Sequence, residues 1–264
     1  MRMTVRRLEA MREAGAPIVA LTCYEASFAR LLNDCGVDIL LVGDSLGMTV
    51  QGRDSTLGVS VEDVAYHVRC VAGVGGPALV MADLPFGSYQ ASPQQAFESA
   101  ARLMSAGAQV VKLEGGEVMS RTVEFISRRG VPVCGHIGLT PQSVHQLGGY
   151  VVQGRDEDAV AQIIADALEL QNAGARMLVL ETVPAPVGRA IRDAVSIPVI
   201  GCGAGPDCDG QVLVLHDMLG VSPPPLPRFV RNFGDGEGGV AHAIRRYVDA
   251  VRDRSFPVIA ECYP

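Results

Sequence analysis

The sequence predicts an α/β protein folded as a (β/α)8 TIM barrel with an extra helix at its N-terminus. Eight short apolar runs recur along the 264 residues, and segments with helical periodicity lie between most of them. The runs are almost continuously hydrophobic, which is typical of parallel strands that are covered on both faces. Eight such units joined by right-handed crossovers close most naturally into a barrel, and an open doubly wound sheet is the alternative.

The strands are expected where apolar and β-branched residues dominate over a short length. In chain order these runs are PIVALTC (17–23), VDILLVG (37–43), PALVMAD (77–83), AQVVKLEG (108–115), VPVCGHI (131–137), ARMLVLET (175–182), IPVIGCG (197–203) and QVLVLHD (211–217).

Helices are expected between these runs, where apolar residues recur with a helical period. The expected ranges are 27–36, 61–74, 92–108, 116–130, 156–175 and 184–196, with the extra helix at 4–14 and a last helix near 238–254. Capping signals mark several boundaries: Ser92 precedes Pro93 at a first helical position, and Gly36 and Gly107 end helices. The segment between the last two strands is too short for a full helix.

Composition limits the functional class. A hydrophobic content of 48% and a mean hydropathy of +0.23 allow a large core, and no Pro-, Ser- or Gly-rich linker divides the chain, so residues 1–264 are expected to form a single domain. The net charge of −7, with dispersed Lys and Arg, argues against a nucleic-acid partner. Seven cysteines without regular spacing indicate reduced thiols in the cytoplasm, and the absence of a long uncharged apolar run predicts no membrane span.

Ionisable residues end five consecutive expected strands. They are Asp44, followed by Ser45, after the second strand, Asp83 at the third, Lys112 and Glu114 at the fourth, His136 at the fifth and Glu181 at the sixth. The carboxyl ends of the strands form the active-site face of a TIM barrel, so the joint occurrence of these residues predicts an active site there.

Each residue also has a structural interpretation when it is taken singly. An acid at a strand end fits a turn or helix-capping role equally well, and a lone histidine such as His136 is more often a satisfied core residue. Lys112 is harder to explain in this way. It lies inside an apolar run, where an unpaired ammonium group is costly, so it needs an acidic partner or an anionic ligand.

Several carboxylates near one lysine suggest a Mg²⁺ site, because Mg²⁺ prefers oxygen ligands and binds one or two carboxylates directly. The histidines and cysteines show no zinc spacing. A 2-oxo acid can chelate Mg²⁺, so the site predicts stabilisation of an enolate. With Asp44, Asp83 and Glu114 assigned to the metal, the remaining carboxylate is that of Glu181. It lies across the barrel mouth from Asp44 and is the expected base.

Six stretches carry longer motifs: LVGDSLGMTVQGRDSTLGV, ADLPFGSY, VKLEGGE, VCGHIGLTPQSVHQLGGYVVQGR, LVLETVP and IGCGAGPDCDGQVLVLHDMLG. From about Thr4 to Phe233 the chain resembles the ketopantoate hydroxymethyltransferase family. The resemblance implies a (β/α)8 barrel that assembles as a decamer of two pentamers. It also implies an enzyme that uses Mg²⁺ and 5,10-methylenetetrahydrofolate to hydroxymethylate 3-methyl-2-oxobutanoate, giving 2-dehydropantoate in pantothenate biosynthesis.

Matched residue by residue, the functional positions of the family fall on the strand ends described above. They are metal ligands at Asp44 and Asp83 with Glu114 in support, substrate contacts at Asp44, Ser45, Asp83 and Lys112, the proton acceptor at Glu181, and a further active-site position at His136. The chain departs from the family at Glu25, where aspartate is more usual, and in the loop around residues 202–208.

Two other classes of protein remain as alternatives. A Mg²⁺-dependent lyase barrel of the isocitrate lyase or phosphoenolpyruvate mutase kind would carry a nucleophilic cysteine in a lid motif. Here Cys134 precedes Gly135 and His136, but it lies in an expected strand without preceding lysines. A barrel that had lost catalysis would be expected to lack at least one of the residues assigned to metal, substrate and proton, and all are present.

Overall fold

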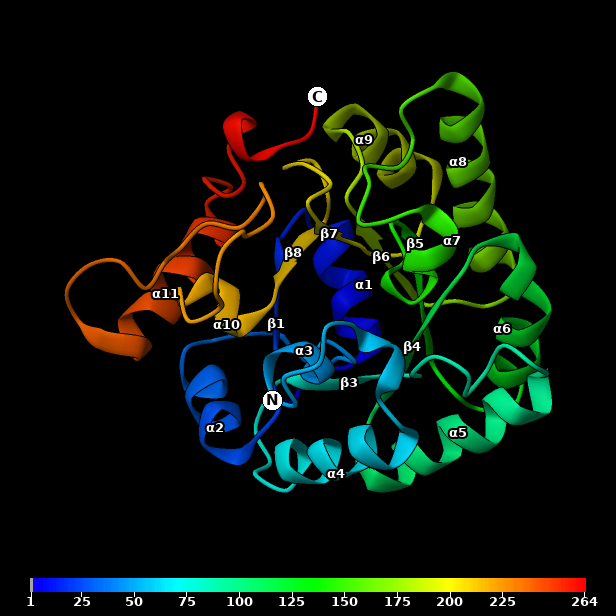
Figure 1. Ribbon diagram of the computed structural model, residues 1–264, viewed down its shortest axis with the longest axis horizontal. Coiled ribbons are helices and arrows are strands. Elements are labelled where there is room, and N and C mark those ends of the chain that lie inside the picture. The colour runs from blue at the N-terminus through cyan, green and yellow to red at the C-terminus, as the bar shows by residue number, and fades with distance from the viewer. Residues whose placement is uncertain (1) are drawn as a thin grey trace.

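The computed structural model describes residues 2–264 and shows a closed barrel of eight parallel strands in chain order (Figure 1). The strands are β1 (Ile18–Thr22), β2 (Ile39–Val42), β3 (Leu79–Asp83), β4 (Val110–Glu114), β5 (Val133–Gly138), β6 (Met177–Glu181), β7 (Val199–Cys202) and β8 (Gly210–Leu213). Ile18 on β1 pairs with Gly210 on β8, which closes the sheet. The predicted TIM barrel is therefore confirmed, and the open doubly wound sheet is excluded.

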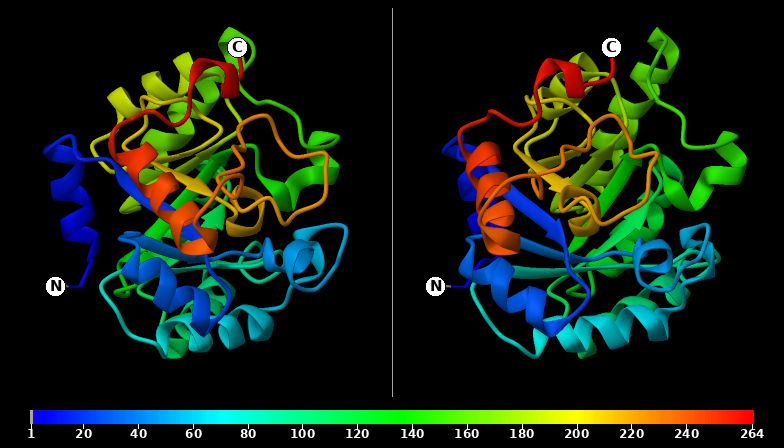
Figure 2. Two further views of the ribbon diagram at one scale, coloured as in Figure 1. Left: turned by 90° about the vertical axis from the view of Figure 1, so that its left-hand side faces the viewer. Right: turned by 60° about the vertical axis from the view of Figure 1, so that its left-hand side comes forward.

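Helices surround the barrel, and the long ones follow the predicted ranges closely (Figure 2). They are α1 (Val5–Glu13), α2 (Ala26–Asp34), α4 (Val61–Ala72), α5 (Pro93–Ala106), α6 (Ser120–Ser127), α8 (Glu157–Asn172), α9 (Ala185–Ala194) and α11 (Gly239–Arg252). Short helical segments lie in the loops: α3 (Leu46–Thr49), α7 (Val144–Leu147), α10 (Leu215–Met218), and the 3-10 turns η1 (Thr56–Gly58), η2 (Glu117–Met119), η3 (Pro141–Ser143) and η4 (Ile259–Glu261). Within residues 2–264, no helix has both the length and the apolar character that a membrane span requires.

Two predicted boundaries are wrong. The eighth strand is expected to run through residue 217, but it ends earlier and α10 begins at Leu215. The Leu215 N–H donates to Thr22 Oγ1 (2.9 Å) instead of to a neighbouring strand, so the chain leaves the sheet there. The helix expected over 116–130 begins as the turn η2 and becomes α6 later, because Gly115 (φ +121°) first turns the chain away from β4.

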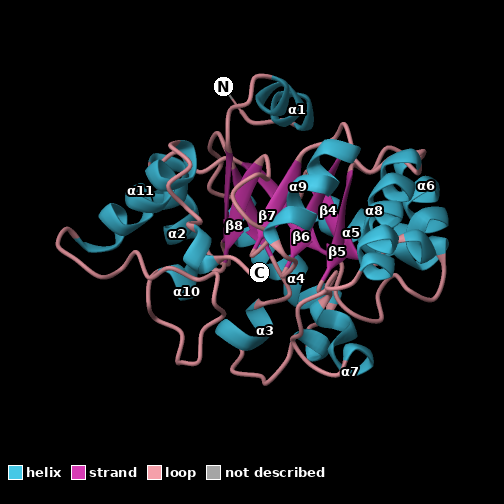
Figure 3. Cartoon of the chain, turned by 90° about the horizontal axis from the view of Figure 1, so that it is seen from above, coloured by secondary structure: helices cyan, strands magenta, loops and turns pink. Residues whose placement is uncertain are grey.

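The amino-terminal end of the barrel is closed by α1. Leu8 is fully buried and packs into a cluster of inward-facing strand residues that includes Ile18, Ile39 and Met177. Figure 3 shows α1 across one end of the strands and α3 and α7 beyond the other end. The helix therefore blocks one mouth of the barrel, and the opposite mouth is left for a site.

Local signals explain why helix α5 has these limits. Ser92 Oγ accepts the N–H of Gln95 (3.2 Å), and Pro93 occupies the first turn, as the capping signal predicts. The helix ends at Gly107, whose φ of +120° favours glycine. A Cβ at Gly107 would lie 2.5 Å from the Cβ of Ala72, so the close approach of α4 also requires glycine there.

Candidate active site

The predicted site residues lie at the carboxyl ends of β2 to β6, at the barrel mouth opposite α1. Register determines several neighbours: Asp83 pairs with Lys112, and Glu114 pairs with His136. Lys112 and Glu114 are two residues apart on β4, so they point to the same face of the sheet. The strands therefore bring a lysine, a histidine and two acids to the same face of the sheet.

Lys112 forms a buried ion pair with Asp83. Its Nζ lies 2.8 Å from Asp83 Oδ1, and both side chains are 5% exposed or less. Burial alone would lower the pKa of Lys112. The carboxylates of Asp83, Glu114 and Asp44 outweigh burial and raise the pKa of this lysine, so it stays charged. The acidic partner that the sequence required for Lys112 is present.

Asp44 is a buried carboxyl group among other acids. Its backbone N–H donates to Asp83 Oδ2 (3.1 Å). Burial is the main cause that raises the pKa of Asp44, and the charges of Asp83 and Glu114 add to it; Lys112 and a hydrogen bond from Gln142 oppose them, and the pKa is about 8. Three carboxyl groups, those of Asp44, Asp83 and Glu114, therefore converge around Lys112.

This cluster fits a divalent cation held by two carboxylates. Asp83 Oδ1 is buried and accepts no well-aligned hydrogen bond from any described residue, although Lys112 Nζ lies close to it. The Glu114 oxygens are engaged, since Oε2 accepts the Gln142 N–H (2.9 Å) and Oε1 lies 3.4 Å from His136 Nδ1. No group of three or more His, Cys, Asp or Glu within residues 2–264 could hold a metal ion by itself. Oxygens of Asp44 and Asp83 are thus the ones best placed for a cation, with Glu114 behind them.

His136 lies between two carboxylates. Its Nδ1 contacts Glu114, and its Nε2 is 3.2 Å from Glu181 Oε2. Burial and the nearby charge of Lys112 act to lower the pKa of His136. The carboxylates of Glu114 and Glu181 outweigh both and raise this pKa to about 9. His136 is therefore not an isolated core histidine, because it connects the acid at the end of β4 with the acid at the end of β6.

Glu181 is the most accessible acid of the group. Its side chain is 18% exposed, whereas the side chains of Asp83, Glu114 and His136 are 3% exposed. β6 is four strands from β2 in the closed barrel of eight, so Glu181 faces Asp44 across the mouth. A carboxylate in this position can reach a molecule that is bound against the opposite wall.

Ser45 is held by the neighbouring loop. Its hydroxyl group lies 2.8 Å from the hydroxyl of buried Tyr24, which follows β1. The Tyr24 ring in turn packs on the His216 ring of α10, with 5.7 Å between ring centroids. Ser45 is thus held by Tyr24 from the loop after β1, and Tyr24 is in turn held by His216 of α10.

Asp44, Glu114 and Glu181 do not act as N-caps of the helical segments that follow them. The N-cap of α3 is Ser45, not Asp44, and it makes no side-chain cap hydrogen bond. The N-caps of η2 and α9 are Gly116 and Pro184, so neither Glu114 nor Glu181 caps the helix that follows it. The acids therefore face the barrel mouth for another reason.

Two residues of the site, Gln142 and Tyr89, are absent from the sequence prediction. Gln142 is 4% exposed and donates from Nε2 to Asp44 Oδ2 (2.8 Å). Tyr89 is 1% exposed and donates to Gln142 Oε1 (2.7 Å). Lys112 was conspicuous in the sequence because it is a charged residue inside an apolar run, and neither Gln142 nor Tyr89 has that property. The available signal was their place in loops that follow β3 and β5.

The cysteine of the competing lyase interpretation is a core residue. Cys134 lies in β5 and is fully buried, and all seven cysteines of the chain are free. Burial raises the pKa of the Cys134 thiol to about 12, against the charge of Lys112. A nucleophilic cysteine needs a lowered pKa, so Cys134 does not fit that role.

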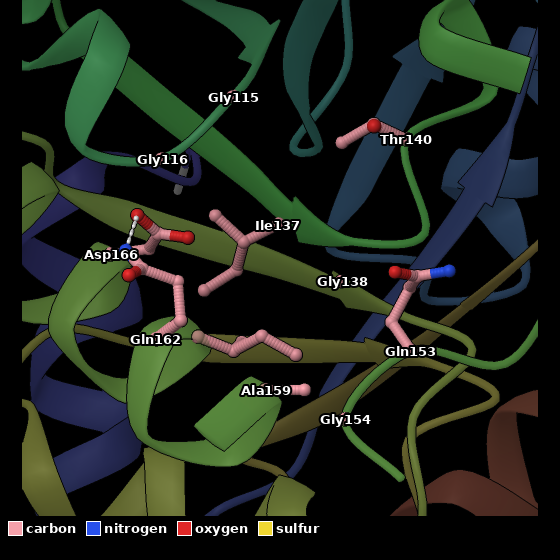
Figure 4. A pocket seen from close by; sticks show the side chains of 11 residues that line it. Gly115, Gly116, Ile137, Gly138, Thr140, Gln153, Gly154, Ala159, Gln162 and Asp166 are labelled. Carbon is pink, nitrogen blue, oxygen red and sulfur yellow. Dashed lines mark hydrogen bonds between the residues drawn. The ribbon is translucent and has the colours of Figure 1, made fainter. Parts of the chain in front are cut away.

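A cavity of about 260 Å³ lies beside the site, between the ends of β4 and β5 and helix α8 (Figure 4). Gly115 and Gly138 line it next to Glu114 and Glu181. Figure 4 shows Gln153 and Thr140 on one side of the cavity and Asp166 and Gln162 on the other. None of the predicted site residues lines this cavity.

Among solved structures, the fold is similar to that of a phosphonopyruvate hydrolase in complex with oxalate and Mg²⁺. The TM-score is 0.61 at 12% identity, and the match covers 80% of this chain and 81% of that one. A likeness at this identity concerns the fold alone.

Sequence relatives are much more similar. The model of the ketopantoate hydroxymethyltransferase family matches residues 2–258, which extends the predicted resemblance beyond Phe233. The 3-methyl-2-oxobutanoate hydroxymethyltransferase of Methylobacillus flagellatus is 57% identical over 261 residues, covering 99% of this chain and 100% of that protein. The enzyme of the same name from Thiobacillus denitrificans is 55% identical over 263 residues, covering 100% of both. On these matches, the chain belongs to the ketopantoate hydroxymethyltransferase family.

Proposed function

We propose that this chain transfers a hydroxymethyl group from 5,10-methylenetetrahydrofolate to 3-methyl-2-oxobutanoate and so produces 2-dehydropantoate for pantothenate and coenzyme A biosynthesis. Its family and the names of its relatives support this activity. The observation that carries the proposal is the buried group of Asp44, Asp83 and Lys112, which faces the more accessible Glu181 across the barrel mouth.

Asp44 and Asp83 would hold Mg²⁺, with Glu114 in support. Support comes from the convergence of these carboxyl groups at one place and from the buried Asp83 Oδ1 that lacks a well-aligned hydrogen bond within the described residues. Bound there together with a 2-oxo acid, Mg²⁺ supplies positive charge that stabilises the enolate.

The substrate is bound by the same wall of the barrel. Lys112 provides a permanently charged ammonium group for the substrate carboxylate, and Ser45 provides a hydroxyl group whose position Tyr24 fixes. Asp44 and Asp83 face the keto-acid end of the substrate. This arrangement directs the carbon next to the ketone away from the buried acids and toward Glu181.

Glu181 removes the proton from C3 of the substrate. Its partial exposure gives it access to the ligand, and His136 Nε2 lies 3.2 Å from its carboxylate, although without a well-aligned hydrogen bond between the two. C3 then forms a bond with the methylene carbon of the co-substrate, both bonds from that carbon to the folate nitrogens break, water supplies the hydroxyl oxygen, and tetrahydrofolate leaves. Glu181, the proposed proton acceptor, is thus separated from Asp44 and Asp83, the proposed metal ligands.

We also propose that the protein assembles as a homodecamer of two pentamers and acts in the cytoplasm. The family resemblance in the sequence supports the assembly, and the seven free thiols suit a reducing compartment. Light scattering of the purified chain measures the assembly directly, and a monomer or dimer at micromolar concentration would contradict it.

Proton exchange tests the proposed function most directly. In D₂O, 3-methyl-2-oxobutanoate is incubated with the protein and Mg²⁺, with and without tetrahydrofolate, and the C3 proton is followed by NMR. We expect exchange that depends on the enzyme and on Mg²⁺, and we expect 2-dehydropantoate when 5,10-methylenetetrahydrofolate is supplied. Absence of both exchange and product would reject the proposal.

A further inference from the structure

The side chain of Gln142 lies among the ends of other strands of the site. It belongs to the turn η3 that follows β5. Its Nε2 donates to Asp44 Oδ2 (2.8 Å) and to the carbonyl oxygen of Leu84 (3.0 Å), just beyond β2 and β3. Its backbone N–H donates to Glu114 Oε2 (2.9 Å) at the end of β4. One residue of the β5 loop therefore contacts the ends of three other strands.

The neighbours of Gln142 fix the orientation of its amide. Nε2 faces two acceptors, the Asp44 carboxylate and the Leu84 carbonyl. Oε1 faces two donors, the Tyr89 hydroxyl (2.7 Å) and Gln90 Nε2 (3.2 Å). The reversed amide would place acceptor against acceptor and donor against donor, so only one orientation is compatible with the site. Among the standard side chains of this length, only glutamine offers donors on one terminal atom and acceptors on the other.

Tyr89 anchors the opposite side of this amide. Its hydroxyl group accepts the Glu114 N–H (3.1 Å) while it donates to Gln142 Oε1. The same hydroxyl group also lies 3.1 Å from the Glu114 carbonyl oxygen, a second acceptor for its proton, but the contact with Gln142 Oε1 is the shorter one. Tyr89 therefore links the Gln142 amide to the backbone of Glu114.

Asp44 is the acid that depends on this arrangement. It is buried, and its backbone N–H donates to Asp83 Oδ2 (3.1 Å), so it lies directly against the second proposed ligand. The Gln142 amide is a neutral donor, so it holds Asp44 Oδ2 without adding a cation that would compete with a metal. With Oδ2 bound to the amide, Oδ1 is the Asp44 oxygen that accepts no hydrogen bond from the described residues.

We propose that Gln142 is a positioning residue for the metal site: its amide fixes the Asp44 carboxylate and its backbone N–H fixes Glu114, so that Asp44 Oδ1 and Asp83 are presented to Mg²⁺. This inference rests on the metal site of the proposed function. Hydrogen bonds to metal ligands typically change metal affinity by about 10- to 100-fold when they are removed. Loss of the amide should therefore weaken Mg²⁺ binding by roughly that factor.

The test compares Gln142→Met with Gln211→Met in the full chain. Methionine keeps the side-chain length but removes both amide donors and the acceptor. Gln211 is also 4% exposed and donates to the carbonyl oxygen of Gly205 (3.0 Å), but it contacts none of the site acids. Isothermal titration with Mg²⁺, in the absence of substrate, gives the dissociation constant of each variant. We expect an increase of about 10- to 100-fold for Gln142→Met and the wild-type value for Gln211→Met.

A second variant keeps the test available if Gln142→Met fails to fold. Tyr89→Phe removes one donor to the Gln142 amide, and a single neutral hydrogen bond corresponds to a change of roughly 2- to 10-fold. Where Gln142→Met does fold, this change should become smaller in the double variant, because Tyr89 acts through Gln142. Mn²⁺ binding followed by electron paramagnetic resonance provides a second readout that does not depend on turnover.

The outcomes separate this inference from the proposed function. If the wild type binds Mg²⁺ and both Gln142→Met and Tyr89→Phe bind it equally well, Gln142 is only a structural residue and the inference is overturned. If the wild type binds neither Mg²⁺ nor Mn²⁺, the inference fails together with the proposed metal site. If the wild type binds Mg²⁺ but produces no 2-dehydropantoate, the proposed function fails, while the relative affinities still decide the role of Gln142.

Discussion

At the residue scale, the environment gives chemically similar acids different properties. Asp44 and Asp83 are buried, and Asp83 forms an ion pair with Lys112. Glu181 lies across the mouth and is partly exposed. A buried acid next to a lysine is suited to binding a cation, and an acid with access to a ligand is suited to accepting a proton from it.

Glu181→Gln tests the proton acceptor. A general base contributes roughly 10²- to 10⁴-fold, so kcat should fall by that factor, and exchange of the C3 proton should fall with it. Affinities for substrate and Mg²⁺ should remain nearly unchanged, because Glu181 lies apart from the buried acids. NMR exchange and steady-state kinetics measure the two effects. Normal exchange in this variant would assign the base elsewhere, with His136 acting through a water as the next candidate.

Lys112→Ala tests the binding of the substrate carboxylate. A hydrogen bond to a charged group contributes about 1.5–3 kcal/mol, so KM should increase by roughly 10- to 100-fold. Arg102→Ala is the control, because Arg102 forms an ion pair with Glu62 (2.7 Å) on the exposed surface. Substrate titrations at saturating Mg²⁺ compare the two variants. A Lys112→Ala variant with the wild-type KM would show that the lysine only balances the charge of Asp83.

At the element scale, each loop at the carboxyl end of the barrel brings one part of the site, and α1 stabilises the other end. Leu8 is the residue of α1 that is fully buried in the barrel interior. The helix lies far along the strands from the site, since it covers their amino-terminal ends (Figure 3). Stability and catalysis are therefore expected to respond to different substitutions.

Leu8→Ala tests this separation. Removal of a fully buried leucine side chain typically lowers the free energy of unfolding by about 2–5 kcal/mol. The half-buried Val5 on the same helix offers the matched variant Val5→Ala, which should cost less. Denaturant unfolding measures both, and kcat at 25 °C should be unchanged in each variant. A large fall in kcat for Leu8→Ala in the folded protein would contradict the separation.

At the scale of the whole molecule, the barrel could be predicted because its signals are local. Continuous apolar runs, periodic helices and caps such as Ser92 specify elements one at a time, and closure follows from their number and order. The end of β8 was missed because it depends on a contact between Leu215 and Thr22, which are 193 residues apart.

The candidate site shows the same limit. The positions of the charged residues could be predicted, because an ionisable group at the end of an apolar run is conspicuous. Their mutual contacts could not, since they depend on side-chain packing between loops. Gln142 illustrates this: it is an uncharged residue of a loop, and its significance comes from Asp44, 98 residues away.

Mg²⁺ should stabilise the whole fold through this site, because a ligand that binds only the folded state adds RT ln(1 + [L]/Kd) to the free energy of unfolding. At a Mg²⁺ concentration 100 times the Kd this is about 2.7 kcal/mol, which corresponds to a rise in Tm of roughly 5–10 °C for a protein of this size. Calorimetry in Mg²⁺ and in EDTA measures the rise. Asp83→Ala should fold, lose Mg²⁺-dependent activity and show almost no rise, since Asp83 supplies one of the two proposed ligands. If Asp83→Ala is stabilised by Mg²⁺ as much as the wild type is, the cation binds elsewhere and the assignment of Asp83 as a ligand is wrong.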